Sequence, residues 1–305
     1  MLRKVVITGA TGMIGIALVN KLISQDIECL LLVKKEFIKE NTLPNSPLCK
    51  IIECDLASLS SFETNETNCD AFIHLGWMAT IGDGRNNSEL QESNIKMTLD
   101  AVRLAHKMGC KVFMGAGSQA EYGPKDEKLT ATLACNPESG YGIAKFAAGK
   151  LSRILANQLG MRHSWARILS IYGPNDNPKT LISYVINSFL NNEKPILTKC
   201  EQDWDYLFVE DCAKALICIA EKGKNGKVYP IGSGTTRKLR EYVEVIYKII
   251  NPSVSIGFGE KDYPQFQPMY LCADISDLKN DTGFELDYSF EKGIEKTIEY
   301  FRGNK

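Results

Sequence analysis

The sequence predicts an α/β protein with a doubly wound parallel sheet and a smaller C-terminal lobe. Three observations indicate this fold. A glycine-rich turn at 9–15 follows the first apolar run, apolar strands alternate with amphipathic helices in the first half, and this rhythm changes after 172–174. Such alternation is typical of parallel βαβ units, whose right-handed crossovers place helices on both faces of a sheet.

Apolar runs and helical periodicity define the elements of the first half in order. We expect strands at 4–8, 28–33, 50–53, 71–75, 111–115 and 164–170. We expect helices at 12–24, 89–108 and 139–159, and two prolines make 34–48 an irregular connection or a short irregular helix.

The second half predicts a smaller lobe from which the chain returns once to the first. Helical patterns cover 179–191 and 237–250, whereas 251–270 contains Gly and Pro and is mostly extended in pattern. The run 204–211 leads into a helix that continues to Ala220. We therefore assign 1–171, with the return segment 203–222, to a dinucleotide-binding domain, and 172–202 with 223–305 to a substrate lobe.

Composition restricts the class of protein. The 305 residues are 44% hydrophobic and 24% charged, which is ordinary for a soluble globular protein. A net charge of -1 provides no electrostatic footprint for nucleic acid or an anionic membrane. No apolar run approaches the roughly 20 residues of a membrane span, and no signal-peptide pattern precedes the first strand. We expect a cytoplasmic protein that binds neither nucleic acid nor membrane.

The cysteines do not form a metal-binding or disulfide pattern. All ten stand singly, without a Cys-x-x-Cys pair, and the three histidines are far apart in the sequence. Most of these cysteines lie in apolar strand or helix patterns, where Cys behaves as a small buried hydrophobe. We expect no metal site.

The glycine turn has the spacing of a Rossmann-type dinucleotide site. Its glycines would provide a tight turn, close approach of a pyrophosphate, and close packing of helix on strand. The turn also opens a helix whose N-terminus can bind phosphate. We infer a cofactor site rather than an ordinary βα turn, with contacts from Gly9, Thr11, Gly12, Met13, Ile14 and Gly15.

The end of the second strand bears on cofactor choice. An acidic residue there favours the ribose hydroxyls of NAD, whereas a basic residue suits the 2′-phosphate of NADP. This chain has Lys34 and Lys35 followed by Glu36. NADP(H) is therefore favoured and NAD(H) remains possible, since two solvated lysines at a strand end are also common.

Two other strand ends carry polar residues. Asp55 would lie beside an adenine edge or act as a plain helix N-cap. His74, on an apolar strand, is interpreted as a core histidine rather than a catalytic base. Leu75 and Gly76 follow it and would bring backbone close to the cofactor.

Tyr141, Lys145 and Ser118 are the predicted catalytic residues. Tyr141 and Lys145 are four residues apart, so they share one face of a helix. There an ammonium would lower the phenol pKa from about 10 towards working pH. Ser118 follows the fifth strand, where it would reach into the crevice at the carboxyl ends of the strands. With a nicotinamide cofactor, this set predicts a redox enzyme.

These motifs together resemble the extended short-chain dehydrogenases/reductases of the NAD-dependent epimerase/dehydratase family, which acts on nucleotide sugars. The resemblance covers nearly the whole chain, and 117–123 and 204–206 are similar to 4-ketosugar reductases of the CDP-abequose synthase-like branch. It implies further cofactor contacts at Leu56, Trp77, Asn94, Ala116, Ile168 and Ser170. It implies substrate contacts at Thr80, Ser118, Gln119, Glu121, Tyr141, Ser170, Trp204 and Arg237.

Two positions depart from that family pattern. Family members often carry Arg where this chain has Trp204, and an Arg-Pro-x-Asp stretch where this chain reads Gln-Pro-Met at 267–269. Both arginines bind the nucleotide diphosphate in the family. Arg237 and Lys238 would replace that charge, or lie on the surface at a helix start.

The resemblance implies an NADP(H)-dependent enzyme that reduces a 4-keto-(6-deoxy)hexose linked to a nucleoside diphosphate. Tyr141 would donate the proton, Ser118 would bind the developing alkoxide, and Lys145 would hold the cofactor ribose. Two alternatives stay open: an NAD-dependent C4-epimerase, and a cofactor-binding protein without turnover. The helices at 89–108 and 139–159 would form a four-helix bundle in a homodimer, because Ala147, Leu151, Ile154 and Leu155 exceed what one sheet face buries.

Overall fold

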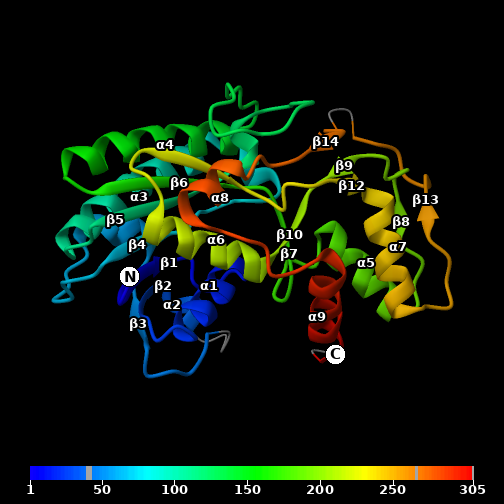
Figure 1. Ribbon diagram of the computed structural model, residues 1–305, viewed down its shortest axis with the longest axis horizontal. Helices are drawn as coiled ribbons and strands as arrows, with labels where there is room; N and C mark the ends of the chain where they lie inside the picture. Colours follow the sequence, from blue (N-terminus) through cyan, green and yellow to red (C-terminus); the bar gives the residue numbers. More distant parts are fainter. Residues whose placement is uncertain (39–42, 265–266, 304–305) are drawn as a thin grey trace.

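The computed structural model describes residues 1–38, 43–264 and 267–303, which form a layered α/β domain with a second lobe at one end (Figure 1). The described residues include a parallel sheet of seven strands in the order β11-β6-β5-β4-β1-β2-β3. These strands are β1 (Lys4–Thr8), β2 (Glu28–Val33), β3 (Cys49–Glu53), β4 (Ala71–His74), β5 (Val112–Ser118), β6 (Arg162–Ile168) and β11 (Lys227–Ile231). The strand order changes direction at β1 and β4, so a crevice opens at their carboxyl ends.

Helices cover both faces of this sheet, which confirms the doubly wound fold. Alternate residues of β1 show why: Val5 and Ile7 pack against the helices of one face and Val6 against those of the other. The first face carries α1 (Met13–Ile23), α6 (Val209–Lys222) and α8 (Ser276–Thr282). The second carries α3 (Ser88–Lys107) and α4 (Gly140–Gln158), and the short α2 (Lys35–Ile38) follows β2.

The return of the chain to the first domain is longer than the sequence predicted. β11 pairs in parallel with β6, and α8 packs against α6 and β11. The assignment of all of 223–305 to the second lobe is therefore wrong for 227–231 and 276–282. Pro230 lies in β11, which is tolerated because this strand is at the edge of the sheet.

The second lobe has its own hydrophobic core, in which aromatic rings pack among aliphatic side chains. Tyr172 and Phe290 lie 5.0 Å apart between ring centroids, and Tyr242 lies 4.5 Å from Phe290. Its helices are α5 (Leu181–Leu190), α7 (Leu239–Ile250) and α9 (Phe290–Gly303). Its short strands are β7 (Ser170–Tyr172), β8 (Ile196–Leu197), β9 (Asp203–Trp204), β10 (Tyr206–Phe208), β12 (Arg237–Lys238), β13 (Gly257–Phe258) and β14 (Tyr270–Leu271).

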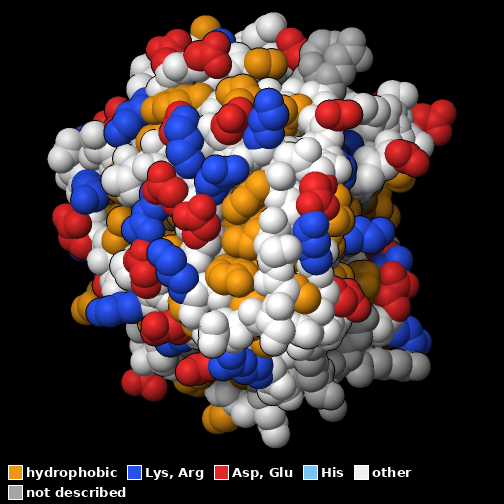
Figure 2. All heavy atoms as spheres, turned by 90° about the vertical axis from the view of Figure 1, so that its right-hand side faces the viewer, with side chains coloured by type: hydrophobic (Ala, Val, Ile, Leu, Met, Phe, Trp, Pro, Cys, Tyr) orange, Lys and Arg blue, Asp and Glu red, His pale blue; other side chains and the backbone are white. Residues whose placement is uncertain are grey.

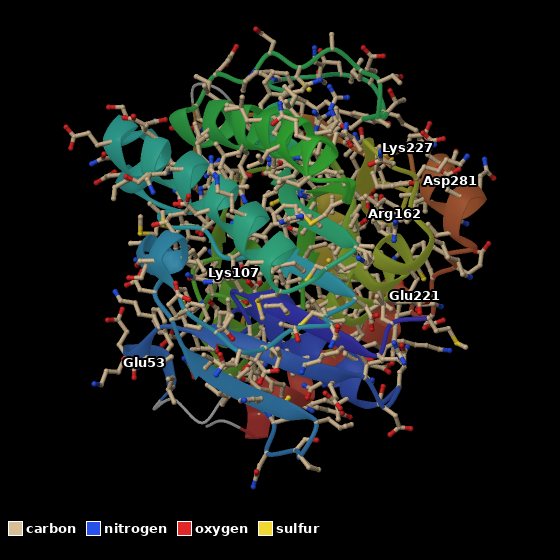
Figure 3. The ribbon with its side chains drawn as sticks, turned by 90° about the vertical axis from the view of Figure 1, so that its left-hand side faces the viewer. Glu53, Lys107, Arg162, Glu221, Lys227 and Asp281 are labelled. Carbon is tan, nitrogen blue, oxygen red and sulfur yellow. The ribbon has the colours of Figure 1, made fainter. Side chains whose placement is uncertain are left out.

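Charged side chains secure the crossing of α6, β11 and α8 (Figure 3). The guanidinium of Arg162 donates to the carbonyl of Ile219 at 3.1 Å and to those of Ala220 and Gly223, at the C-terminus of α6. A cation there is favourable because the last carbonyls of a helix lack partners and carry partial negative charge. Lys227 pairs with Asp281 at 2.6 Å and so joins β11 to α8.

The ten cysteines are free thiols. Within the described ranges, none of the helices combines the length and apolar character that crossing a membrane requires.

Candidate active site

The turn between β1 and α1 has the shape that a dinucleotide needs. Gly9 has a φ of +74°, and a Cβ at Gly15 would lie 2.2 Å from the carbonyl oxygen of Gly9. Gly12 is the N-cap of α1 and gives it no side-chain cap, so the first backbone N–H groups of the helix are available to an anion. These residues fit the pyrophosphate of a dinucleotide cofactor.

A cleft of about 430 Å³ lies beside this turn, at the carboxyl ends of the central strands. None of the described residues that line this cleft is an Asp, a Glu or a His. The lining contains most of the predicted cofactor contacts and all three predicted catalytic residues: Gly9, Gly12, Met13, Ile14, Gly15, Leu75, Trp77, Thr80, Ile81, Ala116, Gly117, Ser118, Tyr141, Lys145, Ile168, Leu169 and Ile171.

Lys145 is a buried cation in this cleft. Its side chain is only 4% exposed, and its ammonium donates to the carbonyl oxygen of Ala116 at 2.6 Å. The same ammonium lies 3.8 Å from the centroid of the Trp77 ring, close enough for a cation–π contact. Burial lowers the pKa of Lys145 to about 7, because desolvation disfavours the charged form.

Tyr141 lies on the same face of α4 as Lys145, as predicted, but its pKa does not follow the prediction. Burial raises the pKa of Tyr141, and neither its hydrogen bond with Ser118 nor the nearby Arg85 guanidinium cancels that rise. The expected lowering by Lys145 is therefore wrong for the protein without ligands. The ammonium is turned towards Ala116 and Trp77, and lies 5.8 Å from the Tyr141 ring centroid.

Ser118 is held by a capping box at the end of β5. Its Oγ accepts from the backbone N–H of Ala120 at 3.2 Å, while its own backbone N–H donates to Glu121 Oε1 at 2.8 Å. Because Oγ already accepts a hydrogen bond, the hydroxyl hydrogen can be directed at a ligand or at Tyr141.

Glu121, predicted as a substrate contact, is instead buried behind the cleft. It has no exposed surface, and Trp165 Nε1 donates to its Oε1 at 2.9 Å. Arg167 Nε donates to Oε2 at 2.7 Å. A carboxylate with these partners cannot reach a substrate, so this prediction is wrong and the residue supports the Ser118 loop.

A hydrogen-bonded brace supports the loop after β4. Asn94 Oδ1 accepts from the backbone N–H of Met78 at 2.9 Å, and its Nδ2 donates to Met78 O at 3.0 Å. Trp77 Nε1 donates to Gln91 Oε1 at 3.0 Å. Asn94, expected to contact the cofactor, therefore uses its amide to hold the segment that places Trp77 against Lys145.

His74 is a core histidine, as interpreted from the sequence. Thr8 Oγ1 lies 2.8 Å from its Nδ1, and burial lowers the pKa of His74 to about 3. The imidazole is neutral and enclosed, so it takes no part in the cleft.

The strand ends at the cofactor-ribose position are charged. Lys34 Nζ lies 3.1 Å from Glu36 Oε1 and 3.6 Å from Asp55 Oδ2. Asp55 also accepts from the backbone N–H of Ala57 at 3.0 Å, which makes it the N-cap of the following helical turn. Lys35 begins α2. The lysine expected to meet a 2′-phosphate is thus already paired with two carboxylates.

Several predicted substrate contacts lie outside the cleft. Trp204 Nε1 donates to Ser170 Oγ at 2.8 Å, which joins β9 to β7. Arg237 Nη1 pairs with Glu291 at 2.5 Å, so its charge is neutralised within the second lobe. Gln119 does not line the cleft, and Thr80 does.

Arg85 lies beside the cleft, and no sequence pattern singled it out. Its guanidinium lies 4.3 Å above the Tyr141 ring, and its Nη1 donates to Thr80 O at 2.7 Å. It stands in a polar loop without a motif, and only the packing of that loop on the start of α4 brings it to the tyrosine. Asn86 Oδ1, which accepts from Gly140 N at 3.0 Å, fixes that packing.

Residues 5–232 match the model of the NAD dependent epimerase/dehydratase family. The chain belongs to this family. Its sequence is 25% identical to CDP-abequose synthase of Salmonella muenchen, over 97% of each chain. It is 26% identical to dTDP-glucose 4,6-dehydratase of Escherichia coli, over 99% of this chain and 94% of the relative.

Other relatives share the fold or only part of their length. This chain is 26% identical to a trifunctional UDP-glucose 4,6-dehydratase/epimerase/reductase of Arabidopsis thaliana, but it spans only 47% of the length of that relative. It superposes on a UDP-N-acetylglucosamine 4-epimerase from Methanobrevibacter ruminantium with a TM-score of 0.89, 24% identity and 99% coverage of both chains. The extended short-chain dehydrogenase/reductase fold is therefore confirmed.

Replacing Lys145 by Met should stabilise the folded protein near neutral pH, with a gain that shrinks as pH rises. The pKa of Lys145 is about 7 in the folded protein against an ordinary 10.5 in the unfolded chain. Between these values only the unfolded chain binds the proton, so the wild-type fold gains stability with rising pH across this window. Denaturant unfolding of both proteins at about pH 7 and about pH 9.5 measures the difference.

The control is Lys248→Met, an exposed lysine on α7 (Leu239–Ile250), which should change little at either pH. An equal gain for Lys145→Met at both pH values would contradict a lowered pKa.

Proposed function

We propose that this protein reduces the 4-keto group of a (6-deoxy)hexose linked to a nucleoside diphosphate, with NADP(H) as the reductant. One observation carries the proposal: a cleft beside a dinucleotide-binding turn combines Ser118, Tyr141 and Lys145 and has no carboxylate among its described lining residues. The match to CDP-abequose synthase over nearly all of both chains supports the substrate class. A binding protein without turnover would not require this proton-donating set.

Tyr141, Ser118 and Lys145 would each perform a different part of ketone reduction. When bound, the nicotinamide cofactor supplies the hydride that goes to C4. Tyr141 donates its phenolic proton to the carbonyl oxygen, and Ser118 donates a hydrogen bond to the same oxygen as charge develops on it. Lys145 holds the cofactor ribose and stabilises the phenolate that remains, until Tyr141 regains a proton from solvent.

The cleft is poorly suited to dehydration. Eliminating water from a hexose needs a base to remove one carbon-bound proton and an acid to protonate the departing hydroxyl. Gln119 and Ala120, which follow Ser118, supply neither, and Glu121 is buried and paired with Arg167. Hydride transfer to or from a carbonyl needs only one group that donates or accepts a proton, and Tyr141 can be that group. The activities that fit this cleft are therefore those of a reductase or an epimerase.

A C4-epimerase that retains NAD is the second candidate, and one observation favours it. Lys34 pairs with Glu36 and Asp55, so an arriving 2′-phosphate would compete with two carboxylates. An epimerase oxidises and re-reduces its own substrate, so it shows no net consumption of free cofactor.

The nucleotide is proposed to bind in a second cavity of about 750 Å³ within the smaller lobe. Aromatic and apolar residues line it, with Lys179 and Lys261 as its basic residues and Trp204 in its wall. These lysines supply charge for a diphosphate in place of Arg237. Figure 2 faces this lobe and shows hydrophobic side chains gathered in the middle of the surface, with Lys and Arg side chains nearby.

A homodimer through α3 and α4 is also proposed. On α4, Ile143 is 52% exposed, Leu151 is 43% exposed and Ile154 is 50% exposed, and these positions share one helical face. Leu155, which we expected in the same stripe, instead packs on the core beneath.

Tyr141→Phe should bind cofactor normally and lose about 10²–10⁴-fold in turnover, because general acid catalysis typically contributes that much. The assay follows oxidation of NADPH with a nucleoside diphosphate 4-keto-6-deoxyhexose, and one NADPH consumed per sugar identifies a reductase. Tyr247→Phe, on α7, is the control. Wild-type turnover by Tyr141→Phe would rule out the proposed mechanism, and sugar interconversion without NADPH loss would establish the epimerase.

NADPH should bind more tightly than NADH, and the difference should be larger at low salt, because Lys34 and Lys35 are exposed. Replacing both with Ala should weaken NADPH binding and barely change NADH binding. Glu36→Gln should strengthen NADPH binding, since it frees Lys34 from one carboxylate. Titrations at two salt concentrations decide this, and tighter NADH binding would favour the epimerase.

Leu151→Glu combined with Ile154→Glu should convert a dimer into a monomer, because both carboxylates would be buried without partners in an apolar interface. Light scattering over a range of concentrations measures the mass. Ile51→Glu places the same charge on an exposed apolar position of β3 and should leave the dimer intact. A wild-type protein that stays monomeric at every concentration would refute the interface.

A further inference from the structure

Gln202 is a buried polar residue with an unmet hydrogen-bonding requirement. It is 3% exposed, and its side-chain Oε1 has no hydrogen-bond partner. Its position is nevertheless fixed, because its backbone carbonyl accepts from the N–H of Leu239 at 2.9 Å. A buried acceptor left unsatisfied destabilises a fold, so its presence calls for an explanation.

Gln202 lines the second-lobe cavity, where flat ligands would find suitable walls. Tyr184 and Trp204 line the same cavity, and a hydrogen bond fixes each of these aromatic side chains. The backbone N–H of Ile196 donates to Tyr184 Oη at 3.0 Å, and Trp204 Nε1 donates to Ser170 Oγ at 2.8 Å. Rigid aromatic side chains beside a free amide oxygen are typical of ligand sites. The ring of the ligand stacks on the aromatic side chains, and its polar edge forms hydrogen bonds with the amide.

A hydrogen bond connects the wall of this cavity to the wall of the reaction cleft. Ser170, which accepts from Trp204, stands between Leu169 and Ile171, and both of these residues line the cleft. A ligand whose ring stacks on Trp204 would therefore lie one hydrogen bond away from the segment 169–171 of the cleft wall. Neither Lys179 nor Lys261 has an ion-pair partner among the described residues, so both are available to a phosphate.

We propose that Gln202 is the specificity-determining residue for the nucleobase, which it recognises through hydrogen bonds from its side-chain amide to the polar edge of a pyrimidine. This inference rests on the proposed function, because it takes the ligand to be a nucleoside diphosphate. Oε1 accepts from an N–H of the base, and the amide nitrogen donates to a base acceptor. An amide can meet uracil, thymine or cytosine by turning over, because it carries both a donor and an acceptor.

The structural alternative is that Gln202 only supports the fold, and stability separates the two roles. If the amide is kept for a ligand, Gln202→Leu removes an unsatisfied polar group and leaves thermal stability unchanged or higher. A supporting role would lower stability. Ser164 Oγ is likewise buried without a hydrogen-bond partner, but Ser164 lines neither the cavity nor the cleft, so Ser164→Ala is the matched control.

The test titrates UDP, dTDP, CDP, GDP and ADP, without sugar or cofactor, into wild type, Gln202→Leu, Gln202→Glu and Ser164→Ala. We expect Gln202→Leu to weaken the preferred pyrimidine nucleotide by about 10- to 100-fold and to lose its preference among bases. Gln202→Glu, which can only accept, should weaken UDP, dTDP and CDP alike, because each pyrimidine also presents an acceptor that the amide nitrogen can meet and a carboxylate cannot. Ser164→Ala should retain the wild-type order.

The outcomes are distinguishable. If wild type binds a nucleoside diphosphate and Gln202→Leu and Gln202→Glu keep its affinity and order of preference, the role of Gln202 is overturned and the proposed function stands. A preference for GDP or ADP in wild type would overturn the pyrimidine assignment. If wild type binds none of the five, the proposed function fails together with this inference.

Discussion

The buried carboxylate of Glu121 is the interaction on which the candidate active site depends. It accepts hydrogen bonds from the backbone of Ser118, the indole of Trp165 and the guanidinium of Arg167. It therefore ties the end of β5 to two positions of β6. Removing one partner of such a buried pair typically costs about 3–5 kcal/mol, because the remaining charge is left uncompensated. The Ser118 hydroxyl thus rests on a network that solvent does not reach.

The same network explains the glycines around it. A Cβ at Gly115, Gly117 or Gly149 would lie 2.1, 2.3 or 2.7 Å from the Trp165 indole, so the ring packs only where these side chains are missing. Trp165 in turn presents its Nε1 to Glu121. The glycine-rich segment before Ser118 is therefore needed for close packing of β5 and α4 around one indole.

The sequence was sufficient to predict the fold and to select Ser118, Tyr141 and Lys145, which line one cleft, because both follow from local patterns. The turn at Gly9 and the helical spacing of Tyr141 and Lys145 require no knowledge of distant contacts. Glu121 could not be placed in the same way: its motif resembles a substrate-contacting loop, and only the pairing of β5 with β6 brings Arg167 to it. Arg85 and Gln202 were missed for the same reason, because each acquires its neighbours through packing between elements that are distant in sequence.

Lys145 and Gln202 are both buried, and each lacks one partner that would stabilise its polar atoms. No described carboxylate lines the cleft around the Lys145 ammonium, and Gln202 Oε1 has no hydrogen-bond donor. The ammonium of Lys145 lies in a cleft without a described carboxylate, so burial lowers its pKa to about 7. An anionic ligand in that cleft would favour the charged form and raise this pKa, and a charged Lys145 would favour the phenolate of Tyr141. The lowering of the Tyr141 pKa, absent from the protein alone, thus becomes a consequence of binding. In the proposed reaction, an anionic ligand would therefore have to charge Lys145 before the pKa of Tyr141, the proposed proton donor, is lowered.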